Sequence, residues 1–134
     1  MKPTCTHLAV HARNVDLSVD FYQRYAQLLE VHRRTDNDTT VVWMGEEGRE
    51  SKFVIVVLGF PHADAVAPPP MAHIGYAVGS RHDVDAVVAM ATDDGILISG
   101  PTEGGPVVGY YCIVADPDGN QVEFSFGQAL GPDA

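Results

Sequence analysis

The sequence predicts an α+β fold in which one domain of 134 residues is built from two tandem βαβββ modules. Three observations lead to this prediction. The order strand, helix, strand, strand, strand can be traced twice along the chain from apolar periodicity. His7 and His73 occupy the same place in the first strand of each copy. Between the copies, residues 61–70 read "PHADAVAPPP", with four prolines and no periodicity, which is typical of a linker.

The first module is expected over residues 4–60. Residues 5–12, "CTHLAVHA", alternate as a strand does, and "NVDLSVDFYQRYAQLLE", residues 14–30, has apolar positions at helical spacing with Asp16 as its expected N-cap. Three β-rich runs follow, "EVHRRT", "TTVVWMG" and "KFVIVVLGF". Because side chains alternate along a strand, Trp43 and Met44 must face opposite sides, and the pattern leaves open which of them enters the core.

The second module is expected over residues 71–127 and repeats this order. Its first strand is "MAHIGYAVG", and its helix is "DVDAVVAMATDDG", which ends in a glycine cap at Gly95. Three more strands are expected in "ILISG", "GYYCIVA" and "NQVEFSF".

Composition limits the possible partners and location. The chain has 8 Lys and Arg against 18 Asp and Glu, a formal net charge of -10, which argues against binding to nucleic acid or to an anionic membrane. No apolar run is long enough to span a bilayer, and the N-terminus lacks the features of a signal peptide, so we expect a cytoplasmic protein. Cys5 and Cys112 are far apart in sequence and are expected to be free thiols.

Three side chains on three predicted strands stand out as metal ligands. His7 shares a strand face with Ala9, His73 shares one with Gly75, and Glu123 lies in the closing strand. Small neighbours leave room beside both imidazoles, and two histidines with one carboxylate form a ligand set that divalent metals accept with positions left open. Two less specific readings remain: duplication could leave two inert histidines, and Glu123 could be the solvent-facing residue of a half-buried strand.

Four motifs carry a resemblance to a known family. "HLAV", "DLSVDFYQRY", "AHIGYAV" and "DPDGNQVEF" resemble the vicinal oxygen chelate superfamily, which includes glyoxalases, bleomycin resistance proteins and extradiol dioxygenases, and the resemblance covers residues 4–126. It implies a glyoxalase/dioxygenase-like fold with a curved mixed sheet around a cleft, usually completed by dimerisation. It also implies a divalent metal at His7, His73 and Glu123. Fe, Mn, Ni, Co and Zn all suit these ligands.

The resemblance does not extend to the details of glyoxalase I. That enzyme has a fourth ligand, a glutamate, where this chain has Val56 or Val57, neither of which can bind metal. His11 and Phe60 stand where its glutathione-binding Arg and Asn are expected. Lactoylglutathione lyase activity is therefore disfavoured.

Two further members of the superfamily also match incompletely. Extradiol dioxygenases place a tyrosine where this chain has Ile113, and fosfomycin resistance enzymes place a threonine where it has Ala9. Bleomycin-type binding proteins use the same cleft without the metal ligands.

The sequence therefore predicts a metal-dependent enzyme of lyase or isomerase type, similar to glyoxalases, that chelates a small oxygenated substrate. His11, on the same strand face as His7, and Tyr111, on the penultimate strand, are the candidate catalytic residues. The alternatives are a ring-cleaving dioxygenase and a dimeric antibiotic- or ligand-binding protein. A homodimer is expected because curved sheets leave apolar edges to cover, and the two modules could pair within one chain or between two chains.

Overall fold

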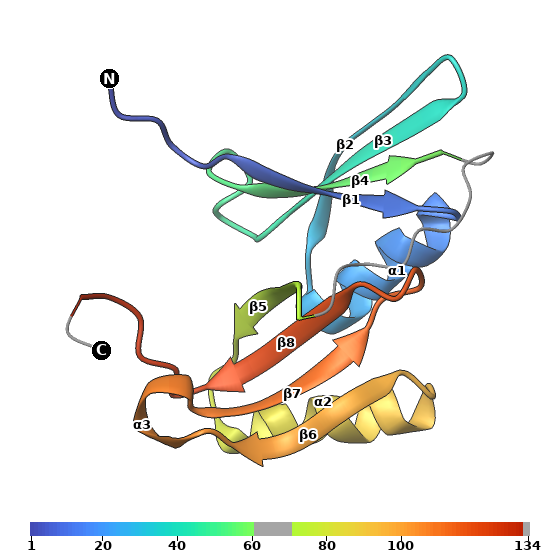
Figure 1. The fold of residues 1–134 in the computed structure, drawn as a ribbon. Helices are drawn as coiled ribbons and strands as arrows, with labels where there is room; N and C mark the ends of the chain where they lie inside the picture. The colour runs from blue at the N-terminus through green and yellow to red at the C-terminus, as the bar shows by residue number, and fades with distance from the viewer. Residues whose placement is uncertain (61–70, 133–134) are drawn as a thin grey trace. The chain divides into compact units, whose positions relative to one another are not determined.

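The computed structural model of the chain describes residues 1–60 and 71–132. It divides the protein into two compact units, Met1–Ala67 and Pro68–Ala134. Each unit contains one four-stranded mixed sheet with a helix packed against it, in the order βαβββ (Figure 1). The predicted α+β fold is thereby confirmed. The predicted linker, residues 61–70, lies outside the described residues.

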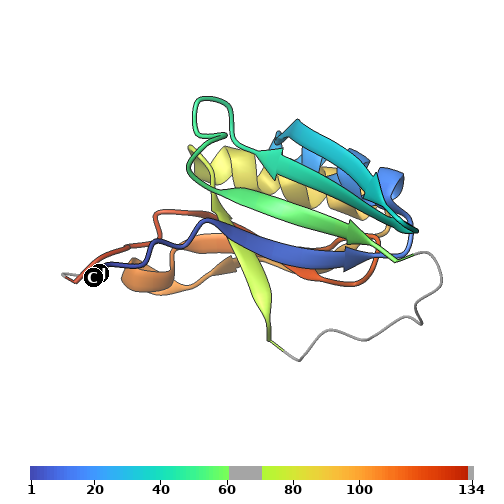
Figure 2. The ribbon, with the colours of Figure 1, turned by 90° about the horizontal axis from the view of Figure 1, so that it is seen from above.

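The first unit forms a sheet in the strand order β1-β4-β3-β2 (Figure 2). Strands β1 and β4 are parallel, and the other neighbours are antiparallel. Its elements are β1 (His7–Ala12), α1 (Val15–Ala26), β2 (Leu29–Asp36), β3 (Thr39–Gly45) and β4 (Val54–Gly59).

One face of this sheet is buried beneath α1. The fully buried side chains include Val42, Met44 and Val57 from the sheet and Tyr22 from the helix. A Cβ on Gly59 would lie 2.1 Å from Cγ2 of Val15, so β4 ends close to the first turn of α1 only because residue 59 is glycine. Met44 is therefore the core residue of the Trp43 and Met44 pair.

The predicted N-cap of α1 was wrong. Asn14, in extended conformation, caps the helix, and its Oδ1 accepts a hydrogen bond of 3.2 Å from the backbone N–H of Leu17. Asp16 lies inside the first turn, where its carboxylate pairs with Arg33 at 3.2 Å. Both residue types cap helices well, so the sequence did not decide between them. The helix also ends earlier than predicted, because Gln27 adopts a left-handed conformation with φ 54° and the chain then enters β2.

The second unit repeats this topology with the strand order β5-β8-β7-β6, in which β5 and β8 are parallel. The cap expected at Gly95 follows the helix, with φ +73°. A one-turn helix, α3, was not predicted, because "GGPVVG" is too short to show helical periodicity. The elements are β5 (His73–Ala77), α2 (Arg81–Asp93), β6 (Leu97–Glu103), α3 (Gly105–Val108), β7 (Tyr110–Ala115) and β8 (Gln121–Phe126).

Helix α2 covers one face of the second sheet through apolar and polar contacts. Val84 of the helix and Val114, Val122 and Phe124 of the sheet are almost completely buried. At the rim, the hydroxyl of Tyr110 donates a hydrogen bond to Asp85. These contacts fix which face of β8 is core and leave the other face for Glu123. No helix in the described parts of the chain is long and apolar enough to cross a membrane.

Candidate metal centre

His73 and Glu123 lie on the same face of the second sheet. In the parallel pair of β5 and β8, His73 is opposite Gln121 and Gly75 is opposite Glu123. Residues that are opposite each other share a face, and so do residues two apart on one strand. One imidazole and one carboxylate are therefore held on adjacent strands, offset by two residues.

Glu123 is a buried carboxylate with space made for it. The residue is only 7% exposed, although Val122 and Phe124 on either side of it fill the core on the opposite face. A Cβ on Gly75 would lie 3.3 Å from Oε2 of Glu123, so glycine leaves room for the carboxylate group. No hydrogen bond or ion pair reaches this carboxylate from residues 1–60 or 71–132. A carboxylate on a largely buried residue, without a protein partner among the described residues, favours the binding of a cation.

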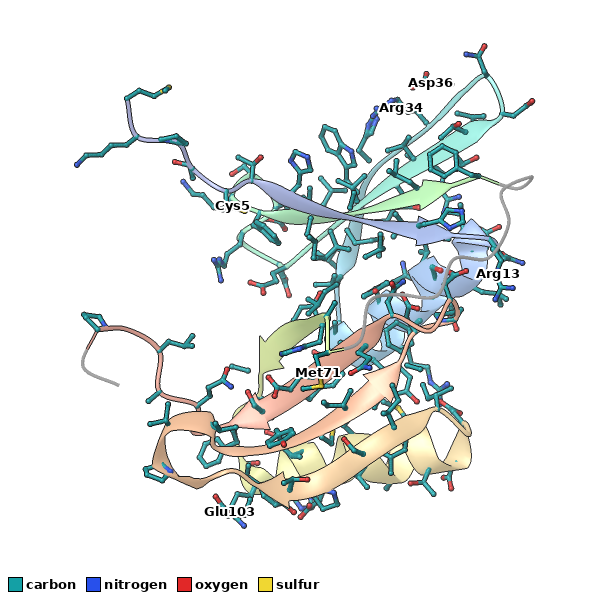
Figure 3. The ribbon with its side chains drawn as sticks, in the orientation of Figure 1. Cys5, Arg13, Arg34, Asp36, Met71 and Glu103 are labelled. Atoms are coloured by element: carbon teal, nitrogen blue, oxygen red, sulfur yellow. The ribbon has the colours of Figure 1, made fainter. Side chains whose placement is uncertain are left out.

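The imidazole of His73 is held in one tautomer. Its Nδ1 lies 2.8 Å from the carbonyl oxygen of Met71, and because a carbonyl only accepts hydrogen bonds, Nδ1 must carry the proton. In the neutral ring, the lone pair is then on Nε2, the arrangement usual in histidines that bind metal. Met71, two residues before β5 (Figure 3), has φ +68°, which is uncommon for a residue other than glycine.

The turn before β8 is fixed by Asp116. Its Oδ1 accepts hydrogen bonds of 2.9 Å from the backbone N–H groups of Asp118 and Asn120, and its Oδ2 accepts one of 2.9 Å from the Asn120 side chain. The turn sets where β8 begins, and strand alternation then determines which face Glu123 takes.

His7 occupies the equivalent position in the first unit. It is the first residue of β1, as His73 is the first residue of β5, and its Nδ1 lies 3.0 Å from Oγ1 of Thr6. Within the part of the chain that the structure describes, no three His, Cys, Asp or Glu side chains are gathered to hold a metal ion. The structure thus brings two of the three predicted ligands onto one sheet and leaves His7 on the other.

Strand register identifies the first-unit counterpart of Glu123. Gly75 is opposite Glu123 in the second sheet, and Ala9 is opposite Val56 in the first. Val56, rather than Val57, is therefore the equivalent residue, and it cannot bind metal. Without a carboxylate to accommodate, the position that is glycine in β5 is alanine in β1. Only the second unit has both an imidazole and a carboxylate at these positions.

The two candidate catalytic residues lie on the corresponding faces. His11 is on the His7 face of β1, its ring centroid is 5.5 Å from that of Phe60, and its Nε2 is buried with no hydrogen-bond partner among the described residues. Tyr111 is opposite Ser125, on the Glu123 face of the second sheet, whereas Tyr110 points to α2. Both residues carry a polar group that could contact a ligand on its own sheet.

A pocket of about 480 Å³ opens on the His7 face of the first sheet. Sequence reasoning identified His7 and Ala9 in its lining but missed the contribution of the central strands and of the loop before β4. The sequence left open whether Trp43 or Met44 enters the core, and the burial of Met44 puts Trp43 in the lining. The lining residues that were missed are Thr6, Arg34, Val41, Glu50, Ser51, Lys52, Phe53, Val54 and Leu58.

Comparisons with known proteins agree with this fold. The family model described as the glyoxalase/bleomycin resistance protein/dioxygenase superfamily matches residues 4–124. An uncharacterised protein of Pseudomonas aeruginosa is 39% identical over 132 residues, covering 98% of this chain and 94% of the relative.

Two solved structures show the same fold at low identity. A trypanothione-dependent glyoxalase I from Leishmania major is 19% identical, with a TM-score of 0.77 over 94% of this chain and 88% of that one. A mutant of the fosfomycin resistance protein of Listeria monocytogenes, complexed with Mn(II) and 1S,2S-dihydroxypropylphosphonic acid, is 16% identical, with a TM-score of 0.76 over 97% and 96% of the two chains. The family model and the Pseudomonas relative together confirm the resemblance found in the sequence motifs: the chain belongs to the glyoxalase/bleomycin resistance protein/dioxygenase superfamily.

Proposed function

We propose that the protein is a metal-dependent enzyme of lyase or isomerase type that binds a small oxygenated substrate on a divalent cation held by His7, His73 and Glu123. The observation that carries the proposal is the buried carboxylate of Glu123, which has no partner among the described residues and lies in the space left by Gly75. The tautomer of His73, set by the Met71 carbonyl, presents Nε2 as a ligand atom and adds support.

The chemistry proposed for the site divides between the cation and the protein. A bound divalent cation would polarise substrate oxygens and stabilise the negative charge that develops on them. Glu123 would supply the negative charge that offsets the cation. His11, whose Nε2 is buried without a partner among the described residues, would accept or donate the transferred proton. Tyr111 would donate a hydrogen bond to a substrate oxygen.

The identity of the metal is open among Fe, Mn, Ni, Co and Zn, all of which accept this ligand set. The Listeria protein binds Mn(II) in its complex, so Mn(II) is the first ion to test.

Ring-cleaving dioxygenase activity is the less favoured enzyme class. Ile113, which stands where those enzymes place a tyrosine, is directly opposite Glu123 in the second sheet. Its side chain has no hydroxyl group to contact a substrate beside the carboxylate. Oxygen uptake with catechols would support the dioxygenase class, and its absence would support the lyase or isomerase class.

Ligand binding without catalysis is the second candidate, and the pocket in the first unit favours it. The pocket is lined largely by apolar side chains, and Glu123 is not part of its lining. Such a protein would bind its ligand equally well after metal removal. Ligand binding that becomes tighter when metal is added would instead support the enzyme.

We also propose that the protein is a homodimer. Strands β1 and β2 lie at the edges of the first sheet, and β5 and β6 lie at the edges of the second. Pairing with another chain is one way to cover such edges. Light scattering during gel filtration should give twice the chain mass of 14.4 kDa, and the chain mass alone would contradict the proposal.

The metal content of Glu123→Gln tests the proposed function. Wild type purified without chelator and soaked in Mn(II) should retain about one equivalent per chain, and Glu123→Gln should bind Mn(II) at least about tenfold more weakly, because changes at and around metal ligands cost roughly tenfold or more in affinity. Glu103→Gln is the matched control, since Glu103 is exposed, on β6, and paired with Arg81. Equal metal in wild type and Glu123→Gln would contradict the proposal.

A further inference from the structure

The pocket of the first unit has a defined long axis. It runs along β4 from Val54, opposite His7, past Val56 to Leu58. These three side chains share one face of the strand, and four residues of strand span about 13 Å. The pocket volume of about 480 Å³ is within the range typical of small-molecule sites.

Trp43 forms the aromatic part of the floor. It is opposite Val56 in the middle of the sheet, yet it is 37% exposed, which is high for an indole in a central strand. Phe53 adds a second ring to the lining, from the residue just before β4. Because aromatic surface exposed in a concave site gains most by covering another flat apolar group, this floor suits a ring-containing ligand.

The two cations of the pocket lie at opposite ends and differ in availability. Arg34 is at the Leu58 end. Its Nε donates to Asp36 at 2.8 Å (Figure 3), and its guanidinium lies 5.8 Å from the Trp43 ring centroid. Lys52 is at the other end, just before Phe53. Within residues 1–60 and 71–132, no ion pair or hydrogen bond engages the Lys52 ammonium. Lys52 is therefore the available cation.

Lys52 is also at the His7 end of the pocket. The N–H of Val54 donates to the carbonyl of Thr6 at 3.0 Å, which joins the loop before β4 to the residue before His7. Glu50 is in the same loop and lines the pocket, but backbone N–H groups of Glu50 and Gly48 hydrogen-bond its carboxylate and lower its pKa. Glu50 remains ionised at neutral pH and weakens, without cancelling, the attraction of Lys52 for an anion.

We propose that this pocket binds an aromatic carboxylate, with its ring over Trp43 and its carboxylate group against Lys52 at the His7 end. The role of this ligand as a substrate rests on the proposed function. In that role, the carboxylate oxygens of the ligand would lie at the end of the pocket that carries His7, a proposed metal ligand.

Benzoate, benzamide and acetate are the probes that test the proposal. Trp43 is the only tryptophan of the chain, so its fluorescence reports on this pocket directly. In the presence of chelator, so that no metal takes part, benzoate should change the fluorescence with saturation. Benzamide, which has the ring without the charge, should bind at least about fivefold more weakly, and acetate, which has the charge without the ring, should give no saturable change.

Substitutions then test which residue causes the preference for a negatively charged ligand. Lys52→Gln should weaken benzoate binding about five- to tenfold and leave benzamide binding unchanged, since one charge-assisted contact at an exposed residue is removed. Lys2→Gln, at the only other lysine, is the matched control and should bind as wild type does. Glu50→Gln should tighten benzoate binding. Thermal unfolding of each variant shows that it is folded.

The outcomes separate this proposal from the proposed function. Equal binding of benzoate and benzamide, or benzoate binding that is unchanged in Lys52→Gln, would overturn the pocket proposal while leaving the metal content of the protein as it is. Loss of metal binding in the experiments on Glu123 has no bearing on benzoate binding in chelator. If benzoate binds as expected and no metal is found, the proposed metal enzyme fails and the pocket assignment stands.

Discussion

At the scale of single residues, the chemistry of the proposed metal site depends on a glycine. Gly75 is opposite Glu123 on the neighbouring strand and leaves space for its Oε2 atom. In the first sheet, the equivalent pair is Ala9 and Val56, where neither residue is polar. Removing the side chain on one strand thus allows a carboxylate to lie buried on the next.

Gly75→Ala is expected to reduce metal binding without unfolding the protein. The added Cβ would lie 3.3 Å from Oε2 of Glu123, tighter than most real contacts, so the carboxylate must shift by a few tenths of an ångström. Such a shift should lower metal affinity at least about tenfold, as changes around metal ligands usually do. Gly79→Ala is the matched control, because its Cβ would also lie 3.3 Å from a carboxylate oxygen, that of Asp83. Equal metal affinity in the two variants would contradict this role of Gly75.

The two cysteines are expected to differ in reactivity. Cys5 is exposed and Cys112 is buried, and burial raises the pKa of the Cys112 thiol from 9.0 to about 11, with the nearby Glu123 charge adding to the effect. Between about pH 9 and pH 11, the Cys112 thiol is protonated in the folded chain and ionised in the unfolded chain. The stability that comes from burying the neutral thiol is therefore complete below about pH 9 and is lost as the pH rises towards 11. At pH 8, a thiol reagent should label one cysteine in the native protein and two in denaturant. Rapid labelling of both in the native protein would contradict this assignment.

At the scale of secondary-structure elements, the face of the sheet on which each strand residue lies was easier to predict than the residues at which helices begin and end. Alternation in "NQVEFSF" put Val122 and Phe124 on one face and Glu123 on the other, and the structure has Val122 and Phe124 in the core. Helix α1 began and ended at residues other than those predicted, because Asn14 and Asp16 are both good caps and because Gln27 takes a left-handed conformation that its type does not signal. Short α3 carries too few residues for any periodicity.

The corrected cap can be tested by paired substitutions. Asn14→Ala removes the acceptor for the Leu17 N–H and should lower the free energy of unfolding by about 1 kcal/mol. Asp16→Asn removes only an exposed charge pair with Arg33 and should change it by less than about 0.5 kcal/mol. Urea denaturation of both variants measures the difference. A larger loss in Asp16→Asn would restore Asp16 as the more important residue at the helix start.

At the scale of the whole molecule, two units of the same topology have diverged in their chemistry. The sequence revealed the repeat and the paired histidines, since both can be read from order and position. It did not reveal that the face of the first sheet around Val56 forms an apolar pocket, because the pocket needs strand register and the fold of the loop that brings Lys52 and Phe53 to it. One unit supplies an imidazole and a carboxylate, and the other an imidazole and the pocket.

The proposed metal site has two imidazole ligands, from His7 and His73, and one carboxylate ligand, from Glu123. X-ray absorption at the metal edge of the Co(II)-loaded protein tests this ligand set, because the spectrum counts imidazole ligands. We expect one cobalt per chain with two imidazoles in wild type, one imidazole in His7→Ala, and two in the control His82→Ala, whose histidine is exposed on α2. A wild-type spectrum with one imidazole or none, or one unchanged in His7→Ala, would contradict it.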